Sequence, residues 1–333
     1  MVRDISTSPR AFTTGVVGHG DWDRVVADTA AFYAGRSWGG GAGAPPQRPP
    51  AEPAASAPPP RLPAALRPLV LLPASWALVE PERGRYDDAE LDRCRKAVSS
   101  ARKAGLEPMI VAHQGALPDW QLAREGWMDP DAGAGWGCYV DRLARAFGEL
   151  VRYWISMWEP LEEAAAYDAE RAVVGRALLD HAATAYLHLK RAPGTAGRPP
   201  WVGVVERCAD WQEPRRAGPL PSVRGRLDAA TRSRLGPEAL FRVLATGRLA
   251  PPFAPVGELP NGTPALDFAG VSWAGGRSVT DDTPTGDAAP EALPQLLLRL
   301  GEHARPLLLV GAPAGAGARA WEAGVRVMGE IGS

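Results

Sequence analysis

Apolar runs of four to six residues alternate along the chain with segments in which apolar residues recur every three or four positions. The runs are typical of strands buried on both faces of a parallel sheet, and the second pattern predicts helices that pack on that sheet. We expect seven strands, within residues 10–18, 69–72, 109–112, 153–157, 201–205, 268–273 and 306–310. We expect helices near residues 23–33, 87–105, 136–150, 169–191, 237–246, 290–303 and 317–331.

This alternation over the whole length predicts either a parallel α/β barrel or an open doubly wound sheet. No G-x-G-x-x-G pattern follows the first strand, so a dinucleotide-binding fold has no support. The 333 residues fit one TIM-type barrel with its loops, because such barrels typically need about 250 residues. We therefore predict a single domain over residues 1–333. Residues 37–63 are rich in Gly, Ala and Pro and have no periodicity, so we expect a flexible surface loop there.

Composition narrows the classes of partner. The formal net charge is -1, without a basic patch or an acidic tail, so we expect no nucleic acid partner. The longest apolar runs fall far short of the roughly 20 residues that span a bilayer, and the first residues do not resemble a signal peptide. We expect a cytoplasmic protein that does not bind membranes. Lys occurs at three positions, so 34 of the 37 basic residues are Arg, which with 37 Gly and 34 Pro indicates a GC-rich genome such as that of an actinomycete.

The fourth expected strand ends abruptly in Trp158-Glu159-Pro160. Three motifs precede it in order: Ser75–Pro81, Gly105–His113 and Leu117–Trp127. This order resembles the front half of a glycoside hydrolase family 1 β-glucosidase, and weaker similarity continues to about residue 310. The resemblance implies an α/β fold, a TIM-barrel-like (β/α)8 barrel. The family's eighth strand would lie beyond the last residue, so we expect an incomplete barrel with about seven strands.

By this resemblance Glu159 is the general acid/base of a two-carboxylate glycosidase site. The family's nucleophile position is occupied by Gly311, which has no carboxylate. The positions at which the family holds its sugar also carry other residues here: Trp22, Leu71, Gln114, Gly115, Trp158 and Ser272–Ala274. Most of these replacements are apolar, which predicts a barrel mouth that is more aromatic and less suited to sugars. Ordinary retaining glycosidase activity is therefore not expected.

Catalytic groups in such barrels lie at the carboxyl ends of strands. We expect Glu159 to be assisted by Glu206 or His113, which follow other strands. Alternatively, Glu206 forms an ion pair with Arg207, Arg215 or Arg216. The expected ligand-binding residues are Gln114, Trp158, Trp22, Asp21, Trp120 and Trp273. The spacing of His19, Asp21 and His113 matches no metal motif, and the three cysteines show no C-x-x-C spacing, so neither a metal nor another cofactor is expected.

Two functions remain open. The first is a repurposed glycosidase-fold enzyme that uses acid/base chemistry on a hydrophobic or glycosylated small molecule, in bacterial specialised metabolism. The second is a non-catalytic pseudo-glycosidase that binds a ligand. Such a protein could also bind a partner, or a second copy of itself, through an open barrel edge, because unpaired strand edges favour pairing with other chains.

Overall fold

The computed structural model describes residues 11–12, 69–167, 170–195, 197–212, 236–253, 257–278, 284–286, 288–289, 291–302 and 307–310. The helices expected near residues 23–33 and 317–331 and the flexible loop expected at residues 37–63 lie outside the described residues. The predicted single domain therefore stays a prediction.

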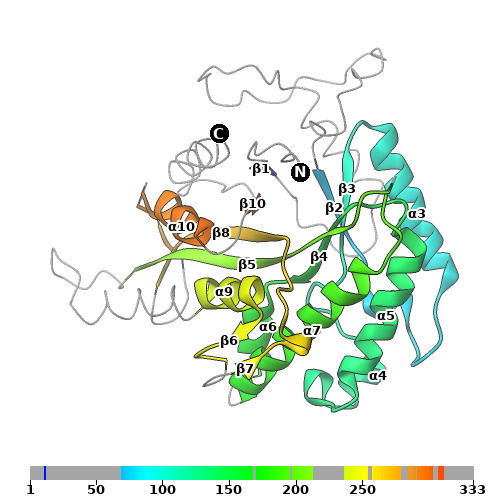
Figure 1. Cartoon of the computed structure of the whole chain (residues 1–333), viewed down its shortest axis with the longest axis horizontal. Coiled ribbons are helices and arrows are strands. Elements are labelled where there is room, and N and C mark those ends of the chain that lie inside the picture. The colour runs from blue at the N-terminus through cyan, green and yellow to red at the C-terminus, as the bar shows by residue number, and fades with distance from the viewer. Residues whose placement is uncertain are drawn as a thin grey trace, which may run out of the picture.

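A curled sheet of parallel strands forms the centre of the structure, in the order β1–β10–β8–β5–β4–β3–β2 (Figure 1). Its strands are β1 (Ala11–Phe12), β2 (Leu69–Pro73), β3 (Glu107–Val111), β4 (Tyr153–Trp158), β5 (Trp201–Gln212), β8 (Phe268–Ser278) and β10 (Leu307–Val310). The short β9 (Pro284–Gly286) pairs antiparallel with β8, and β6 (Arg248–Leu249) pairs with β7 (Gly257–Glu258) in a separate ribbon. The predicted fold class, an incomplete (β/α)8 barrel with about seven parallel strands, is confirmed.

Helices cover the outer face of the sheet (Figure 1). The long ones are α3 (Asp88–Lys103), α5 (Ala132–Phe147), α7 (Arg171–Lys190), α9 (Pro237–Thr246) and α10 (Ala292–Gly301). Shorter turns are α2 (Trp76–Val79), α4 (Asp119–Leu122), η2 (Gly126–Met128), α6 (Pro160–Ala165) and η4 (Pro260–Gly262). Among the described residues, no helix has the length and apolar character that crossing a membrane requires.

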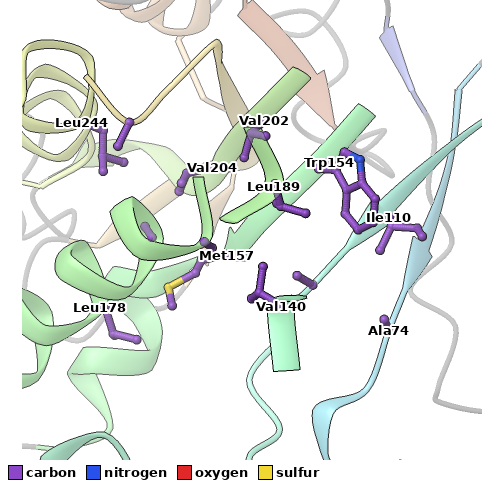
Figure 2. Close-up of a cluster of buried hydrophobic side chains, with 14 of the residues drawn as sticks. Ala74, Ile110, Val140, Trp154, Met157, Leu178, Leu189, Val202, Val204 and Leu244 are labelled. Carbon is purple, nitrogen blue, oxygen red and sulfur yellow. The ribbon is translucent and has the colours of Figure 1, made fainter. Parts of the chain in front are cut away.

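Successive strand residues point to opposite faces of the sheet and enter two separate hydrophobic clusters. On β2, Val70 and Leu72 join the outer core between sheet and helices, whereas Leu69 and Leu71 join the inner cluster in the barrel interior. Figure 2 shows part of the outer core, where Ile110 and Trp154 from the sheet lie near Val140 of α5. The buried members of the inner cluster are Leu69, Leu71, Met109, Val111, Ile155, Val205, Phe268, Leu308 and Val310.

Much of the tryptophan content serves the outer core. The Trp76 ring lies 5.4 to 5.9 Å, between centroids, from four other rings, those of Trp120, Trp127, Trp136 and Tyr139. The Tyr139 hydroxyl lies 3.0 Å from the carbonyl oxygens of both Ala74 and Ala112, which follow β2 and β3. Aromatic rings thus hold the loops after these two strands against α5, and the buried Tyr139 hydroxyl has hydrogen-bond partners.

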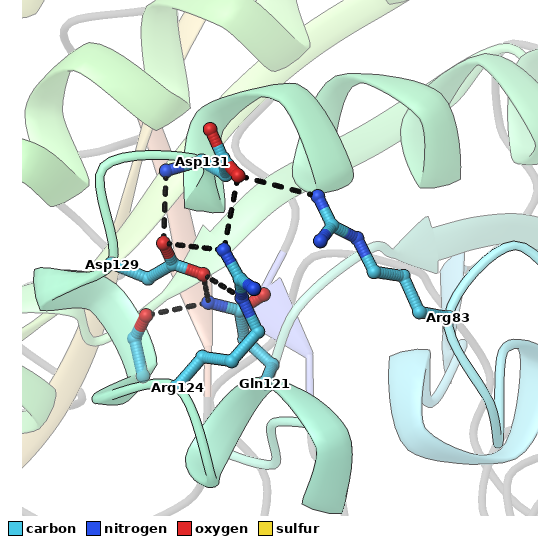
Figure 3. Close-up of polar contacts among 6 residues, drawn as sticks. Arg83, Gln121, Arg124, Asp129 and Asp131 are labelled. Atoms are coloured by element: carbon cyan, nitrogen blue, oxygen red, sulfur yellow. Dashed lines mark hydrogen bonds and ion pairs between the residues drawn. The ribbon is translucent and has the colours of Figure 1, made fainter.

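Charged residues fix the loop that joins η2 to α5 (Figure 3). Arg124 lies 2.6 Å from Asp129 and 3.0 Å from Asp131, and the Asp131 N–H donates to Asp129 at 3.0 Å. Hydrogen bonding from Arg124 lowers the pKa of Asp129 to about 2. The Gln121 side chain donates to the Gly126 carbonyl at 2.7 Å. Because this loop follows β3, the network orders one side of the barrel end at which the strands terminate.

Candidate functional site at the carboxyl ends of the strands

Glu159 lies directly after β4, at the carboxyl end of the sheet. Its backbone is left-handed, with φ 50° and ψ 52°, a conformation that is uncommon for residues other than Gly. Its N–H donates to the Val205 carbonyl of β5 at 2.7 Å. Pro160 then begins α6, where its fixed φ suits the first helical position. The sharp turn from strand to helix therefore sets where the Glu159 side chain points.

The Glu159 carboxyl group is half-buried, and its surroundings change its acidity. Burial raises its pKa, although hydrogen bonds with the Ser272 and Trp158 side chains and the charge of Arg207 partly offset that effect. Ser272 lies on β8, opposite Arg207 of β5 in the register of the two strands. The Arg207 guanidinium also lies 2.5 Å from Glu162 of α6. A carboxyl group with a raised pKa and several polar neighbours is suited to donating a proton as well as accepting one.

Glu206 follows Val205 along β5 but faces the other way. Val205 belongs to the inner cluster, whereas Val204 and Cys208, each two residues from Glu206, belong to the outer core. Glu206 accordingly points towards α6, where its carboxyl oxygens accept hydrogen bonds from Leu161 N at 3.0 Å and Arg207 N at 2.8 Å. Burial raises its pKa to about 8, with a further contribution from the charge of Glu159. The two carboxyl groups thus affect each other, but from opposite faces of the sheet.

His113 is buried in the outer core. Its Nε2 lies 2.7 Å from Oε2 of Glu163, whose other oxygen accepts a hydrogen bond from the Trp127 indole at 2.5 Å. The His113 ring makes edge contacts with Trp127 and Trp136, at centroid distances of 5.2 and 5.9 Å. Burial alone raises the pKa of Glu163, but the charge of His113 and the hydrogen bonds from His113 and Trp127 outweigh it and lower the pKa. His113 is therefore paired with Glu163 within the outer core.

The remaining expected ligand-binding residues divide by location. Trp158 is half-buried and packs against the inner cluster, and Gln114 is half-buried after β3. Trp273 is 8% exposed within the outer core, and Trp120 packs there against Trp76 and donates its indole N–H to the Glu80 carbonyl. Both had been expected to bind the ligand. Neither indole faces the barrel interior, because both lie in the outer core. Trp22 and Asp21 lie outside the described residues.

Three residues beside Glu159 were not predicted as site residues: Ser272, Arg207 and Glu162. For Ser272 a signal existed, since it is four residues after Phe268 and so shares the inner face of β8. Arg207 can be found by the same alternation, counted from Val205. Within the described part of the chain, no group of three or more His, Cys, Asp or Glu side chains could hold a metal ion.

The curled parallel sheet, its outer helices and the Glu-Pro turn after the fourth strand define a barrel like those of the family 1 glycosidases. The β-glucosidase of Thermotoga maritima is 18% identical, with a TM-score of 0.57 over 72% of this chain and 60% of that one. A β-glycosidase from Pyrococcus horikoshii is 15% identical, with a TM-score of 0.63 over 78% of this chain and 67% of its own. An aphid myrosinase is 15% identical, with a TM-score of 0.61 over 78% and 71% of the two chains.

Sequence comparison leads to the same group. Beta-glucosidase 34 of rice is 28% identical over 131 residues, which are 38% of this chain and 24% of the relative. Beta-glucosidase 40 of Arabidopsis thaliana is 27% identical over 88 residues, or 26% and 17% of the two chains. No family model matches the chain. The chain is thus similar to family 1 β-glucosidases in sequence and fold, and it matches about a quarter or less of the length of these two relatives.

Proposed function

We propose that this chain binds a small molecule at the carboxyl end of β4, beside the middle of β5 and β8, and that Glu159 acts on it as a general acid or base. The environment of Glu159 carries the proposal. The residue combines a strained backbone, a half-buried carboxyl group and a raised pKa at the end of a barrel strand. Strained backbones and shifted pKa values are concentrated at functional sites, and barrel enzymes place catalytic groups at this end of the strands.

The side chains around Glu159 favour a ligand with a hydrophobic or aromatic part. Trp158 packs against an inner cluster that remains apolar up to the strand ends, with Val111, Val205 and Val310 among its buried members. Ser272 and Arg207 supply the polar partners. A glycosylated aromatic or other apolar molecule fits this mixture, and the β-glucosidase and β-glycosidase names of the relatives support the inclusion of a sugar.

Retaining glycosidases use two carboxyl groups about 5 Å apart on the same substrate, and inverting ones use a wider pair. Here the carboxyl group that was expected to pair with Glu159, that of Glu206 within β5, faces α6 and accepts hydrogen bonds from two backbone N–H groups. The proposed chemistry therefore depends on a single carboxyl group that donates or accepts a proton, rather than on a nucleophile and acid/base pair. In this proposal the activity belongs to the specialised metabolism of a GC-rich bacterium, which the Arg, Gly and Pro content supports.

A second candidate function is ligand binding without catalysis. It is favoured by the commitment of His113 to Glu163 and of Glu206 to the first turn of α6, which leaves Glu159 without either expected assistant. In this alternative, β2 is also relevant, because it ends the sheet in the described part of the chain and could receive a strand from a partner or a second copy.

The experiment uses a library of aryl glycosides, glycosylated aromatics and the corresponding aglycones. Thermal shift identifies ligands, and mass spectrometry then tests each ligand for conversion by the wild-type protein, by Glu159→Gln and by the exposed control Glu149→Gln. We expect Glu159→Gln to retain binding and to lower kcat at least about a hundredfold, the low end for a general acid or base, while the control is unchanged. Full turnover by Glu159→Gln would refute the catalytic proposal. Binding without conversion of any ligand would establish the second function.

A further inference from the structure

The carboxyl group of Glu206 connects strand β5 to the first turn of α6. The side chain is 1% exposed. Its Oε2 accepts a hydrogen bond from Leu161 N at 3.0 Å, and its Oε1 accepts one from Arg207 N at 2.8 Å. Leu161 is the second residue of α6, where backbone N–H groups have no partner within the helix. Glu206 therefore satisfies an otherwise unpaired donor two residues after Glu159.

The turn that Glu206 holds is the one that carries Glu159. A left-handed conformation is unfavourable for a residue other than Gly, so it persists only where neighbouring contacts enforce it. The turn is fastened to β5 at both ends: Glu159 N donates to the Val205 carbonyl at 2.7 Å, and Leu161 N donates to Glu206. The Glu159 carbonyl in turn accepts from Glu162 N and Glu163 N, both at 3.1 Å. Loss of the Glu206 contact would remove one of the two hydrogen bonds that hold the turn on β5.

Glu206 can hold this turn without adding a second negative charge beside Glu159. Burial raises the pKa of Glu206 to about 8, and the charges of Glu159 and Glu162 contribute further, so the group keeps its proton at neutral pH. Other charged groups face the same side of β5, since Glu238 of α9 and Arg299 of α10 act on the neighbouring Cys208. A neutral carboxyl group still offers acceptor oxygens to two N–H groups.

We infer that Glu206 is a positioning residue, whose buried carboxyl group holds the 159–161 turn so that the Glu159 carboxyl group reaches Ser272. This inference deepens the proposed function and rests on it only for the role of Glu159. It also gives Glu206 a role different from that of a second catalytic carboxylate, because its oxygens contact backbone N–H groups on the helix side and not the barrel interior.

The test compares Glu206→Met and Glu206→Gln with a matched control, Glu80→Met. Glu80 is also buried and accepts two hydrogen bonds, from the Trp76 indole and from Gly84 N, both at 2.7 Å, but it lies after β2. The readout is the titration of Glu159, followed by the 13C chemical shift of glutamate labelled at the side-chain carboxyl and assigned by its loss in Glu159→Gln. This measurement needs neither a ligand nor turnover.

In Glu206→Met we expect the pKa of Glu159 to fall towards its ordinary value, because the released carboxyl group gains water. This removes the effect of burial, the largest cause of the raised pKa, and outweighs the loss of the Ser272 hydrogen bond, which acts in the opposite direction. Glu206→Gln should shift it less, since the amide oxygen still accepts one of the two hydrogen bonds. Glu80→Met should lower the melting temperature without moving the titration of Glu159. An unchanged Glu159 titration in folded Glu206→Met, or an equal shift in Glu80→Met, would overturn the inference.

If Glu206→Met does not fold, a second measurement decides. In Glu159→Gln the titration of Glu206 should move below its wild-type pH, because the negative charge that raises it has been removed. An unchanged Glu206 titration would mean that the two groups do not sense each other, and the inference fails. If instead the titrations behave as expected but no reaction depends on Glu159, the proposed function fails and the positioning role stands.

Discussion

The imidazole Nε2 of His113 lies 2.7 Å from a carboxyl oxygen of Glu163 on α6, and the two side chains are 1% and 11% exposed. Burial removes water from both groups, so each depends on the other for its polar partner. The pair also explains why a histidine that directly follows β3 does not face the barrel interior. Its role here is to join the loop after β3 to the helix after β4.

Replacement of His113 by Leu should therefore act on stability. Removal of one partner of a buried pair leaves the other uncompensated, which costs about 3–5 kcal/mol of unfolding free energy. Denaturant unfolding at neutral pH measures the loss. The double replacement His113→Leu with Glu163→Leu should be less destabilising than the sum of the single changes, because no unpaired charge remains. Additive effects in this cycle would argue against the pair.

Acid should destabilise the protein through His181. Burial, together with a smaller contribution from the charge of His113, lowers the pKa of His181 from 6.5 to about 4. The unfolded chain therefore binds a proton at a higher pH than the folded chain does. The resulting stability is present above pH 6.5 and is lost as the pH falls towards 4. At about 1.4 kcal/mol for each pKa unit, the loss is on the order of 3 kcal/mol.

This second prediction is checked by unfolding free energies measured between pH 7 and pH 4. His181→Phe should flatten the dependence over that range, because a non-titrating ring takes the place of the imidazole. Leu178→Ala, on the same helix α7, should lower stability to a similar degree at every pH and leave the slope unchanged. The idea fails if His181→Phe keeps the wild-type slope.

Two glycines let β5 and β8 approach each other in the barrel interior. A Cβ added at Gly203 would lie 2.4 Å from the Phe268 ring and 2.5 Å from its carbonyl oxygen, and one at Gly270 would lie 2.4 Å from Val205. Gly203→Ala should destabilise the fold by about 1–3 kcal/mol, the usual cost of overpacking. Gly175→Ala on α7 is the matched control, because its Cβ would meet only Ala164, at 3.8 Å. Gly175→Ala should raise the unfolding free energy by about 0.5–1 kcal/mol. Equal changes in unfolding free energy for Gly203→Ala and Gly175→Ala would contradict this account.

Periodicity alone located most of the barrel. The apolar runs at residues 69–72 and 153–157 correspond to β2 and β4, and Pro237–Thr246 begins and ends where the sequence indicated. Asp87 caps α3 by accepting hydrogen bonds from Ala89 N and Glu90 N, at the start of the helix expected near residues 87–105. These features are local, so the pattern of neighbouring residues determines them.

The candidate site was only partly predictable, because the direction of a side chain depends on register. Glu159 could be placed from its strand-end motif. Glu206 was expected directly after the fifth strand, but β5 continues to Gln212. Glu206 faces α6 because the alternation along β5 puts Val205 inside and Glu206 outside. The direction of the His113 side chain could not be predicted, because its polar partner, Glu163, lies fifty residues away in the sequence. Sequence position gives the end of a strand, whereas packing decides which face a residue occupies there.

The last prediction concerns simple aryl β-glycosides, which we expect the protein not to hydrolyse at a useful rate. By resemblance the nucleophile position is Gly311, which has no carboxylate. Glu206 lies on β5, the strand beside Glu159, and its oxygens are engaged with Leu161 N and Arg207 N. Without an attacking carboxylate the retaining route loses several orders of magnitude in rate.

The measurement is release of nitrophenol from nitrophenyl β-glycosides of several sugars, with Glu159→Gln and Glu149→Gln in parallel. We expect wild-type release no faster than that of either variant. Robust hydrolysis that Glu159→Gln abolishes and Glu149→Gln leaves intact would show that another group serves as nucleophile. In that case Glu206→Gln separates two explanations. Loss of activity together with a shifted Glu159 titration indicates a positioning role, whereas loss of activity with an unshifted titration indicates that Glu206 itself takes part in the reaction.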